Sequence, residues 1–382
     1  MDRTLFGSEH QLFRDSVRAF FAREVTPRAD EWEEAGIVDK AMFRAAGQQG
    51  LLGMAIPEGY GGGGSPDFRF NVIIGEESAR AGTLASGMCI TLHNDVCLPY
   101  FLDLTTEEQK RRWLPGMASG DLMSAIAMTE PGAGSDLAGI TTTAIRDGDH
   151  YVVNGSKTFI TNGINADVVI VAVKTDPEAR HAGMSLLVVE DGMDGFERGR
   201  NLAKIGMHAQ DTAELFFNDV MVPADNLLGE EGKGFLHLVA NLPQERLSLA
   251  AGAVAHAEAA FGWTLEYVTE RKAFGTPIGG FQAVKHRMAE MATELEIARV
   301  YIDRQVDMLN AGRLSAEDAA KSKWWTTELE KRVIDSCLQF FGGWGYMEEY
   351  PIARAFRDAR VQTIYGGTTE IMKEIVGRSL GL

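Results

Sequence analysis

The sequence predicts a mainly α-helical protein with one β-sheet domain between two helical regions. Apolar residues recur at helical spacing from residue 8 to about 118, and again from about 232 to the end. The segment between them holds six or more short β-rich runs that no helical pattern separates, which disfavours a doubly wound fold. We therefore expect an N-terminal helical domain (1–120), a middle β domain (121–228) and a C-terminal helical bundle (229–382).

Local signals place the elements of the first two domains. The first helix carries Leu12, Phe13 and Val17 on one face of SEHQLFRDSVRAFFAREV. Thr105 stands three residues before Glu108, which predicts a capping box at the last helix of this region. In the β region, the pair Asn154-Gly155 lies between YVV and KTFI, and it predicts a tight hairpin turn.

Four long helical patterns follow the β region. They cover residues 232–271, 281–312, 315–341 and 368–380. We expect these helices to form the C-terminal domain, a four-helix bundle.

Composition narrows the function. The 382 residues carry a net charge of −17, so the chain repels polyphosphate backbones and we expect no nucleic-acid partner. Three cysteines without a C-x-x-C pair argue against a disulfide framework or a zinc site, so no metal is expected. No apolar run is long enough for a membrane span, and the N-terminus lacks a signal-peptide core. We expect a cytoplasmic protein.

Two segments of the β region could bind a flat ligand. In AMTEPGAGSDLAGI, a β-run ends at Thr129 and a loop follows whose glycines, among them Gly134, permit close backbone approach beside Ser135. An ordinary tight loop explains the same residues equally well. In NGSKTFITNG, Phe159 and Thr161 alternate along a strand and share a face, which could wall a ring system or simply belong to the sheet core.

Three segments of the helical region could carry chemistry. In ERKAFGTPIGGFQ, Arg271 and Phe274 lie one helical turn apart, and the arginine could hold a pyrophosphate. In LPQERLSLAAGA, Glu245 enters a small, apolar helix, where desolvation would raise its pKa and make it a usable base. The alternative is a first-turn glutamate stabilised by the helix dipole. Near the end, YGGTTE is either a helix N-cap or a backbone cradle for a ligand.

Taken together and in this order, these segments resemble the acyl-CoA dehydrogenase family. AMTEPGAGSD is similar to the family's first signature and FQAVKHRMAEMATELEIAR to its second, and the spacing of RKAFG, QFFGGWG and YGGT also fits. The resemblance covers essentially the whole chain and implies the family fold. It also implies an FAD enzyme that removes a proton from the α carbon of an acyl-CoA thioester. Hydride then passes from the β carbon to the flavin, which gives trans-2-enoyl-CoA.

The resemblance further implies which residues meet FAD and substrate. The flavin is expected to lie among Met128, Thr129, Gly134, Ser135, Phe159 and Thr161. The FAD of a neighbouring subunit is expected at Arg271, Phe274, Gln282, Gln339 and Gly343, which implies a homo-oligomer, typically a homotetramer. The diphosphate end is expected at Thr368 and Glu370. The acyl-CoA is expected at Ser135, Arg246, Tyr365 and Gly366.

One position departs from the family pattern. Most straight-chain members carry the catalytic glutamate directly after the tyrosine of the last motif, where this chain has Gly366. The long-chain and isovaleryl-type branches carry the base on the earlier helix instead. The pairing of LPQERL with YGGT is similar to the long-chain branch, and it implies Glu245 as the base. The N–H of Gly366 is then left to polarise the thioester carbonyl.

We therefore expect an FAD-dependent acyl-CoA dehydrogenase of fatty acid β-oxidation, with an electron-transfer flavoprotein as electron acceptor. Three alternatives of the same fold remain open: an acyl-CoA oxidase, a biosynthetic or branched-chain acyl dehydrogenase, and a non-catalytic acyl-CoA binder.

Overall fold

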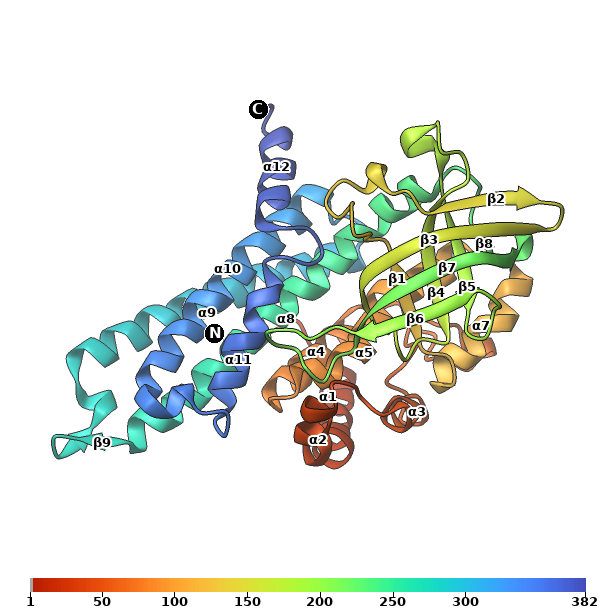
Figure 1. The fold of residues 1–382 in the computed structure, drawn as a ribbon. Coiled ribbons are helices and arrows are strands. Elements are labelled where there is room, and N and C mark those ends of the chain that lie inside the picture. Colours follow the sequence, from red (N-terminus) through yellow and green to blue (C-terminus); the bar gives the residue numbers. More distant parts are fainter. Residues whose placement is uncertain (1–2) are drawn as a thin grey trace.

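The N-terminal part of the chain is helical, as predicted. The computed structural model describes residues 3–382 (Figure 1). The α-helices of this part are α1 (Ser8–Phe20), α2 (Ala29–Ala35), α3 (Lys40–Gln48), α4 (Arg69–Arg80), α5 (Leu84–Thr91), α6 (Leu98–Asp103) and α7 (Glu107–Ser119). Two π-helical segments, η1 (Phe21–Val25) and η4 (Leu92–Cys97), continue α1 and α5. Such wide turns are frequent at functional sites, and η4 forms part of the pocket described below.

The capping box of α7 lies one residue later than the sequence predicts. The Gln109 N–H donates to the Thr106 hydroxyl at 3.3 Å, and the Gln109 side-chain oxygen accepts the Thr106 N–H at 2.8 Å. The hydroxyl of Thr105 donates instead to the carbonyl of Phe101. The prediction of Thr105 and Glu108 as the box was therefore wrong: both threonines fit the pattern, and the structure has Thr106 as the N-cap, with extended backbone.

The middle of the chain forms a twisted mixed sheet. Its strands are β1 (Ser124–Ala127), β2 (Thr143–Asp147), β3 (His150–Thr161), β4 (Val168–Lys174), β5 (Met184–Glu190), β6 (Phe196–Asn201), β7 (Thr212–Pro223) and β8 (Leu227–Leu228). The order is β6-β7-β3-β2-β4-β5-β8, and β1 pairs with β4 in parallel. Most other neighbours are antiparallel, so the long strands β3 and β7 form a broad ribbon along one side (Figure 1).

The predicted hairpin turn at Asn154-Gly155 was wrong. Both residues lie inside β3, where the register against β7 shifts between Val153 and Gly155. Gly155 has a φ of 147°, and a Cβ there would lie 2.5 Å from the Thr142 hydroxyl. The Asn154 amide bonds across to Asp219 at 2.8 Å. The pair thus marks a β-bulge, which needs the same backbone freedom as a turn.

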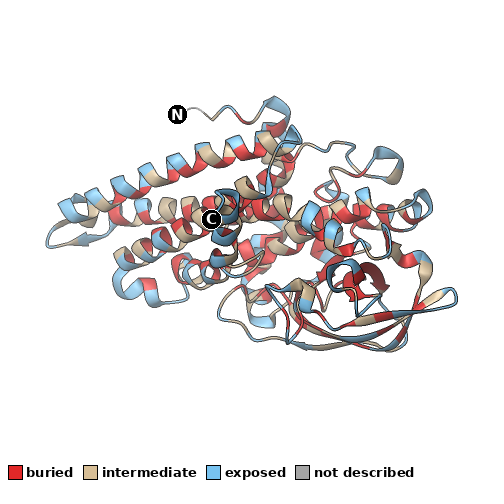
Figure 2. Cartoon of the chain, turned by 90° about the horizontal axis from the view of Figure 1, so that it is seen from above, coloured by how far each residue is buried: buried red, intermediate tan, exposed pale blue. Residues whose placement is uncertain are grey.

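The C-terminal part is a helical bundle that starts with a 37-residue helix. Its elements are α8 (Gly234–Glu270), the small hairpin of β9 (Lys272–Ala273) and β10 (Thr276–Pro277), α9 (Gln282–Asn310), α10 (Ala316–Phe341), α11 (Pro351–Gln362) and α12 (Thr369–Ser379). The four long predicted patterns all correspond to helices, and α11 is an additional one. The inward faces of these helices are buried and the outward faces exposed (Figure 2).

No helix within residues 3–382 is long and apolar enough to cross a membrane. Across the same residues, no group of three or more His, Cys, Asp or Glu side chains is arranged to hold a metal ion.

Candidate active site

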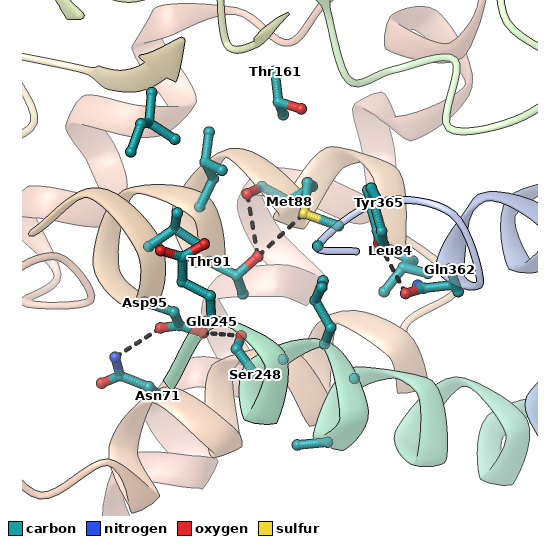
Figure 3. A pocket seen from close by; sticks show the side chains of 18 of the residues that line it. Asn71, Leu84, Met88, Thr91, Asp95, Thr161, Glu245, Ser248, Gln362 and Tyr365 are labelled. Atoms are coloured by element: carbon teal, nitrogen blue, oxygen red, sulfur yellow. Dashed lines mark hydrogen bonds between the residues drawn. The ribbon is translucent and has the colours of Figure 1, made fainter. Parts of the chain in front are cut away.

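A pocket lies where the three parts of the chain meet. Its wall combines residues of α4, α5 and η4 with the end of β1, the end of β3, the middle of α8, and the loop between α11 and α12. Glu245 of α8 and Tyr365 of the loop both lie on this wall (Figure 3). Most of the lining is apolar, so a charged group here is largely removed from water.

Glu245 is the carboxylate of this pocket, and it lies well inside α8. The helix begins at Gly234 and continues through Pro243, so Glu245 is not a first-turn residue and the helix-dipole alternative is wrong. Its side chain is 5% exposed. Burial raises its pKa to about 7, against the lowering effects of Tyr100, Arg246 and Asn241. The predicted desolvation of this carboxylate is confirmed.

Two donors fix the orientation of Glu245. The Tyr100 hydroxyl donates to Oε1 at 2.9 Å and the Asn241 amide donates to the same atom at 3.1 Å. Within residues 3–382, no hydrogen bond is found to Oε2. One oxygen is therefore held in place while the other can accept a proton.

The loop after α11 takes a conformation that only glycine adopts readily. Gly366 and Gly367 have φ values of 64° and 99°. A Cβ at Gly366 would lie 2.4 Å from Cδ1 of Leu249 in α8. A side chain at position 366 therefore requires the tip of the half-buried Leu249 side chain to move.

Two buried cations hold the carbonyls of this loop. Arg246 Nε donates to the Gly366 carbonyl at 3.3 Å, and Lys323 Nζ of α10 donates to the Gly367 carbonyl at 2.7 Å. No hydrogen bond to the Gly366 N–H is found in the described part of the chain. The N–H is thus available to an acceptor such as a carbonyl oxygen.

The β domain supplies the opposite wall with Met128, Thr129, Phe159 and Thr161. Phe159 has a φ of 60° and is 68% exposed, because the pairing of β3 with β7 is irregular between Lys157 and Ile160. Phe159 and Thr161 therefore both reach the pocket, through a bulge and not through regular strand alternation.

A buried ion pair ties the loop after β1 to β3. Lys157 Nζ lies 2.8 Å from Glu130 and donates to the Met128 carbonyl at 3.1 Å. Burial lowers the pKa of Lys157 to about 8. Burial alone would raise the pKa of Glu130, but Lys157 lowers it to about 2. Met128 and Thr129 are thereby held beside Phe159.

The other predicted residues lie away from the pocket wall. Gly134 and Ser135 are on an exposed loop beyond Thr129, and Glu370 is exposed in the first turn of α12. Thr368 caps α12, since its hydroxyl accepts the Ile371 N–H at 3.4 Å. The N-cap reading of YGGTTE is therefore confirmed.

A second set lies at the end of the bundle away from the sheet, where Figure 1 shows β9. Its exposed members are Arg271, Phe274, Gln282, Gln339 and Gly343. Arg271 and Phe274 are not one helical turn apart, as predicted. α8 ends at Glu270, and Phe274 sits at the tip of the β9–β10 hairpin, with a φ of 51° and 99% exposure. Gln282 opens α9 as expected.

Three residues that contact Glu245 or the loop after α11 were not predicted from the sequence. Tyr100 lies 145 residues from the carboxylate it contacts, and Lys323 sits in a helix whose pattern looks like plain packing. Asn241 stands four residues before Glu245, and this helical spacing could have revealed it.

Comparisons with known proteins identify the class. Models of three domains match nearly the whole chain: acyl-CoA dehydrogenase, N-terminal domain (7–121), middle domain (125–220) and C-terminal domain (232–381). The chain belongs to the acyl-CoA dehydrogenase family. The family resemblance and the fold class predicted from the sequence are confirmed.

Within this family the chain is similar to the long-chain specific acyl-CoA dehydrogenase, mitochondrial, of Sus scrofa, with 50% identity over 99% of this chain and 88% of the relative. The crystal structure of an acyl-CoA dehydrogenase from Geobacillus kaustophilus superimposes with a TM-score of 0.97, at 50% identity and full coverage of both chains. An acyl-CoA dehydrogenase from Bacillus anthracis complexed with FAD superimposes with a TM-score of 0.92, at 33% identity over 98% of this chain and 68% of that one.

Proposed function

We propose that this protein catalyses the FAD-dependent α,β-dehydrogenation of a fatty acyl-CoA thioester to trans-2-enoyl-CoA, as in β-oxidation, with Glu245 as the base. The observation that carries the proposal is the buried Glu245 carboxylate, held at Oε1 and open at Oε2. An α proton of a thioester is weakly acidic, so its removal needs a base whose pKa lies near neutrality. The similarity to a long-chain specific relative supports a fatty acyl substrate.

Each residue around Glu245 would have a separate role in the reaction. The α proton would move to Oε2 of Glu245, since Oε1 already accepts two hydrogen bonds. The Gly366 N–H would donate to the thioester oxygen, where negative charge develops as the proton leaves. Arg246 and Lys323 would keep that N–H in place by holding the two carbonyls of the loop. Tyr365 lines the same pocket and would contact the acyl group.

The wall opposite Glu245 fits a flavin. Met128, Thr129, Phe159 and Thr161 present a half-open face of backbone, hydroxyl and aromatic groups. A Cβ at Gly132 would meet no atom within 4 Å, and one at Gly134 would only touch Thr129, so the adjoining loop leaves space for a ligand. FAD, when bound, supplies the acceptor for the hydride of the β carbon. Gly134, Ser135, Thr368 and Glu370 would border it further along, and Ser135 would also face the acyl-CoA.

The exposed set at the far end of the bundle supports an assembly. We infer that Arg271, Phe274, Gln282, Gln339 and Gly343 meet the FAD of a neighbouring subunit in a homotetramer. An aromatic side chain that is 99% exposed on a hairpin tip is typical of a contact surface. Electrons would pass on to an electron-transfer flavoprotein, and we place the enzyme in the cytoplasm.

Anaerobic reduction of the flavin tests the function. The purified yellow protein should bleach when dodecanoyl-CoA is added, and a pure acyl-CoA binder would stay yellow. Glu245→Gln should keep FAD bound and lose bleaching by several orders of magnitude, because no other group replaces an essential base. A normal bleaching rate in this variant would disprove the assignment. Slow reoxidation by air and fast reoxidation by electron-transfer flavoprotein separate the dehydrogenase from an oxidase.

A further inference from the structure

Three polar side chains meet on a wall of the pocket whose lining is mostly apolar. Asn71 comes from α4, Asp95 from η4 and Ser248 from α8. Asn71 Nδ2 donates to Asp95 Oδ1 at 2.7 Å, and the Ser248 hydroxyl donates to Asp95 Oδ2 (Figure 3). We call these three residues the polar cluster. Their neighbours on the wall are aliphatic, aromatic or thioether groups: Phe68, Val72, Leu84, Met88, Leu92 and Val96.

Burying the Asp95 carboxylate on the wall of a fatty-acyl pocket costs stability. It is 3% exposed, and within residues 3–382 no Lys, Arg or His forms an ion pair with it. Burial raises its pKa to about 7, against the lowering effects of Ser248 and Asn71. A buried carboxylate without a cation lowers stability, and an apolar side chain would suit an alkyl chain better.

The cluster also keeps hydrogen-bonding capacity toward the cavity. Asn71 and Ser248 are half-buried, and each makes one side-chain hydrogen bond, to Asp95. The Asn71 amide oxygen and the lone pairs of the Ser248 hydroxyl have no partner in the described part of the chain. Thr91, on the same wall, lies outside the cluster, because its hydroxyl donates to the Met88 carbonyl of its own helix at 3.1 Å.

The position of the cluster relative to Glu245 fixes which part of a substrate it would meet. Ser248 lies three residues after Glu245 on α8, so the two side chains are neighbours on one helix surface. Gln244 donates to the Asp95 backbone carbonyl at 2.9 Å and locks η4 against this turn of α8. A chain whose α carbon meets Glu245 would pass the cluster roughly four carbons further on, because one helical turn separates side chains by about 5–6 Å.

We propose that Asn71, Asp95 and Ser248 form a specificity site for acyl-CoA substrates that carry a hydroxyl group on the chain, near carbon 6. A hydroxyl matches the cluster because it donates to a carboxylate or amide oxygen and accepts from a serine hydroxyl or an amide N–H. Sites built to hydrogen-bond a substrate hydroxyl discriminate strongly against the analogue that lacks it. This inference rests on the proposed function and names its substrate class.

The test compares 5-, 6- and 7-hydroxydodecanoyl-CoA with dodecanoyl-CoA as substrates of the holoenzyme. The kcat/KM of the best hydroxy substrate, divided by that of dodecanoyl-CoA, should exceed one in the wild type. The ratio should fall at least tenfold in Asp95→Leu, and it should fall in Ser248→Ala, a smaller change that protects the test if the first variant does not fold. Asp95→Asn should retain much of the preference, because the amide still hydrogen-bonds.

Thr91→Val is the matched control, since it removes a hydroxyl from the same wall outside the cluster and should leave the ratio unchanged. An equal ratio in wild type, Asp95→Leu and Ser248→Ala would overturn the inference. If no acyl-CoA bleaches the wild type, the proposed function itself fails. If dodecanoyl-CoA bleaches it and no hydroxyl preference exists, only the specificity site fails.

Discussion

Glu245 is held by groups from two different parts of the chain. Asn241 lies on its own helix, but Tyr100 comes from α6 of the N-terminal part. Both donors stabilise the ionised carboxylate and work against the burial that raises its pKa to about 7. The N-terminal helices therefore help to set the pH at which the base is unprotonated.

Replacing Tyr100 by phenylalanine should move the pH profile of the enzyme. A hydrogen bond to a charged group contributes about 1.5–3 kcal/mol, so its loss should raise the pKa of Glu245 by about one unit. The base acts unprotonated, so activity rises with pH through this pKa, and the acidic limb of kcat/KM should shift to higher pH. Tyr60→Phe is the control, because Tyr60 donates to the surface residue Glu107 at 2.7 Å. An unchanged limb in Tyr100→Phe would contradict the role given to this bond.

A side chain at position 366 would compete for space with the side chain of Leu249. Moving the base by the double change Glu245→Gly with Gly366→Glu should yield reduced activity, since the tip of Leu249, 2.4 Å from the new Cβ, must shift to admit it. Adding Leu249→Ala should recover part of it, although a non-glycine residue at a φ of 64° still costs about 1–2 kcal/mol. Anaerobic bleaching rates of the double and triple variants measure this. Equal rates would show that Leu249 is not the obstacle.

At the scale of elements, α10 positions the loop that follows α11. Lys323 is buried, and its Nζ holds the Gly367 carbonyl at 2.7 Å. Burial and the nearby Arg246 lower its pKa to about 8. By binding the Gly367 carbonyl, α10 thus fixes the position of the neighbouring Gly366 N–H.

Lys323→Met should lower kcat for flavin reduction while FAD remains bound. The change leaves the Gly367 carbonyl without its donor, which costs about 1–3 kcal/mol and loosens the loop that carries the Gly366 N–H. Loss of a transition-state contact lowers kcat and kcat/KM together, whereas loss of substrate binding alone raises KM. Lys321→Met provides the control on the same helix, because Lys321 pairs with Glu317 one turn earlier on α10. An effect confined to KM would contradict the positioning role.

The sequence predicted elements well where periodicity was long and poorly where backbone geometry was special. The long patterns of α8, α9 and α10 were found because each helix buries one face over many turns. Asn154-Gly155 was misread because a bulge and a turn favour the same residues. Arg271 and Phe274 were given helical spacing because Pro277 and the glycines around it did not reveal the hairpin of β9 and β10.

Some residues of the candidate site were likewise predicted from the sequence and others were not. The apolar sequence after Glu245 made it a candidate base, and the resemblance to the long-chain branch decided between that role and a first-turn glutamate. Tyr100, Lys323 and Asp95 were missed because tertiary packing alone brings Tyr100 to Glu245, Lys323 to the Gly367 carbonyl and Asp95 to the pocket wall. Single-sequence patterns report neighbours along one element and carry no information on which elements pack together.

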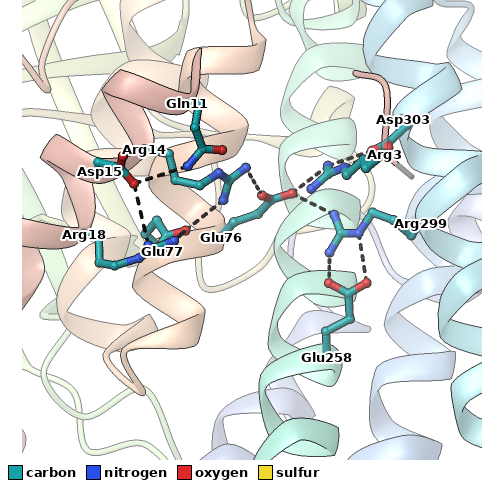
Figure 4. A network of polar contacts seen from close by, with 10 residues as sticks. All are labelled: Arg3, Gln11, Arg14, Asp15, Arg18, Glu76, Glu77, Glu258, Arg299 and Asp303. Atoms are coloured by element: carbon teal, nitrogen blue, oxygen red, sulfur yellow. Dashed lines mark hydrogen bonds and ion pairs between the residues drawn. The ribbon is translucent and has the colours of Figure 1, made fainter. Parts of the chain in front are cut away.

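At the scale of the whole molecule, a chain of ion pairs joins the N-terminal helices to the bundle (Figure 4). Glu76 of α4 is its centre, with Arg14 of α1 at 2.6 Å, and Arg3 and Arg299 of α9 each at 2.8 Å. Arg299 continues to Glu258 of α8. Burial by itself would raise the pKa of Glu76, but Arg299, Arg3 and Arg14 lower it to about 2. The pocket lies between the parts that this network connects.

Glu76→Gln should lower the free energy of unfolding at pH 7 by about 3 kcal/mol, because it breaks a buried ion pair and leaves three arginines with fewer partners. The folded pKa of Glu76, about 2, lies below the value of about 4.3 expected for an unfolded glutamate. Its contribution is therefore complete above about pH 4.3 and is lost as the pH falls toward 2. Urea unfolding of the full chain at pH 7 and at pH 3 should show a large difference between wild type and variant at pH 7 and a smaller one at pH 3.

The control is Glu374→Gln, which removes an exposed pair with Arg378 and should change stability by less than about 0.5 kcal/mol. An equal loss for Glu76→Gln at both pH values would mean that packing, and not the charge of Glu76, holds the N-terminal helices to the bundle.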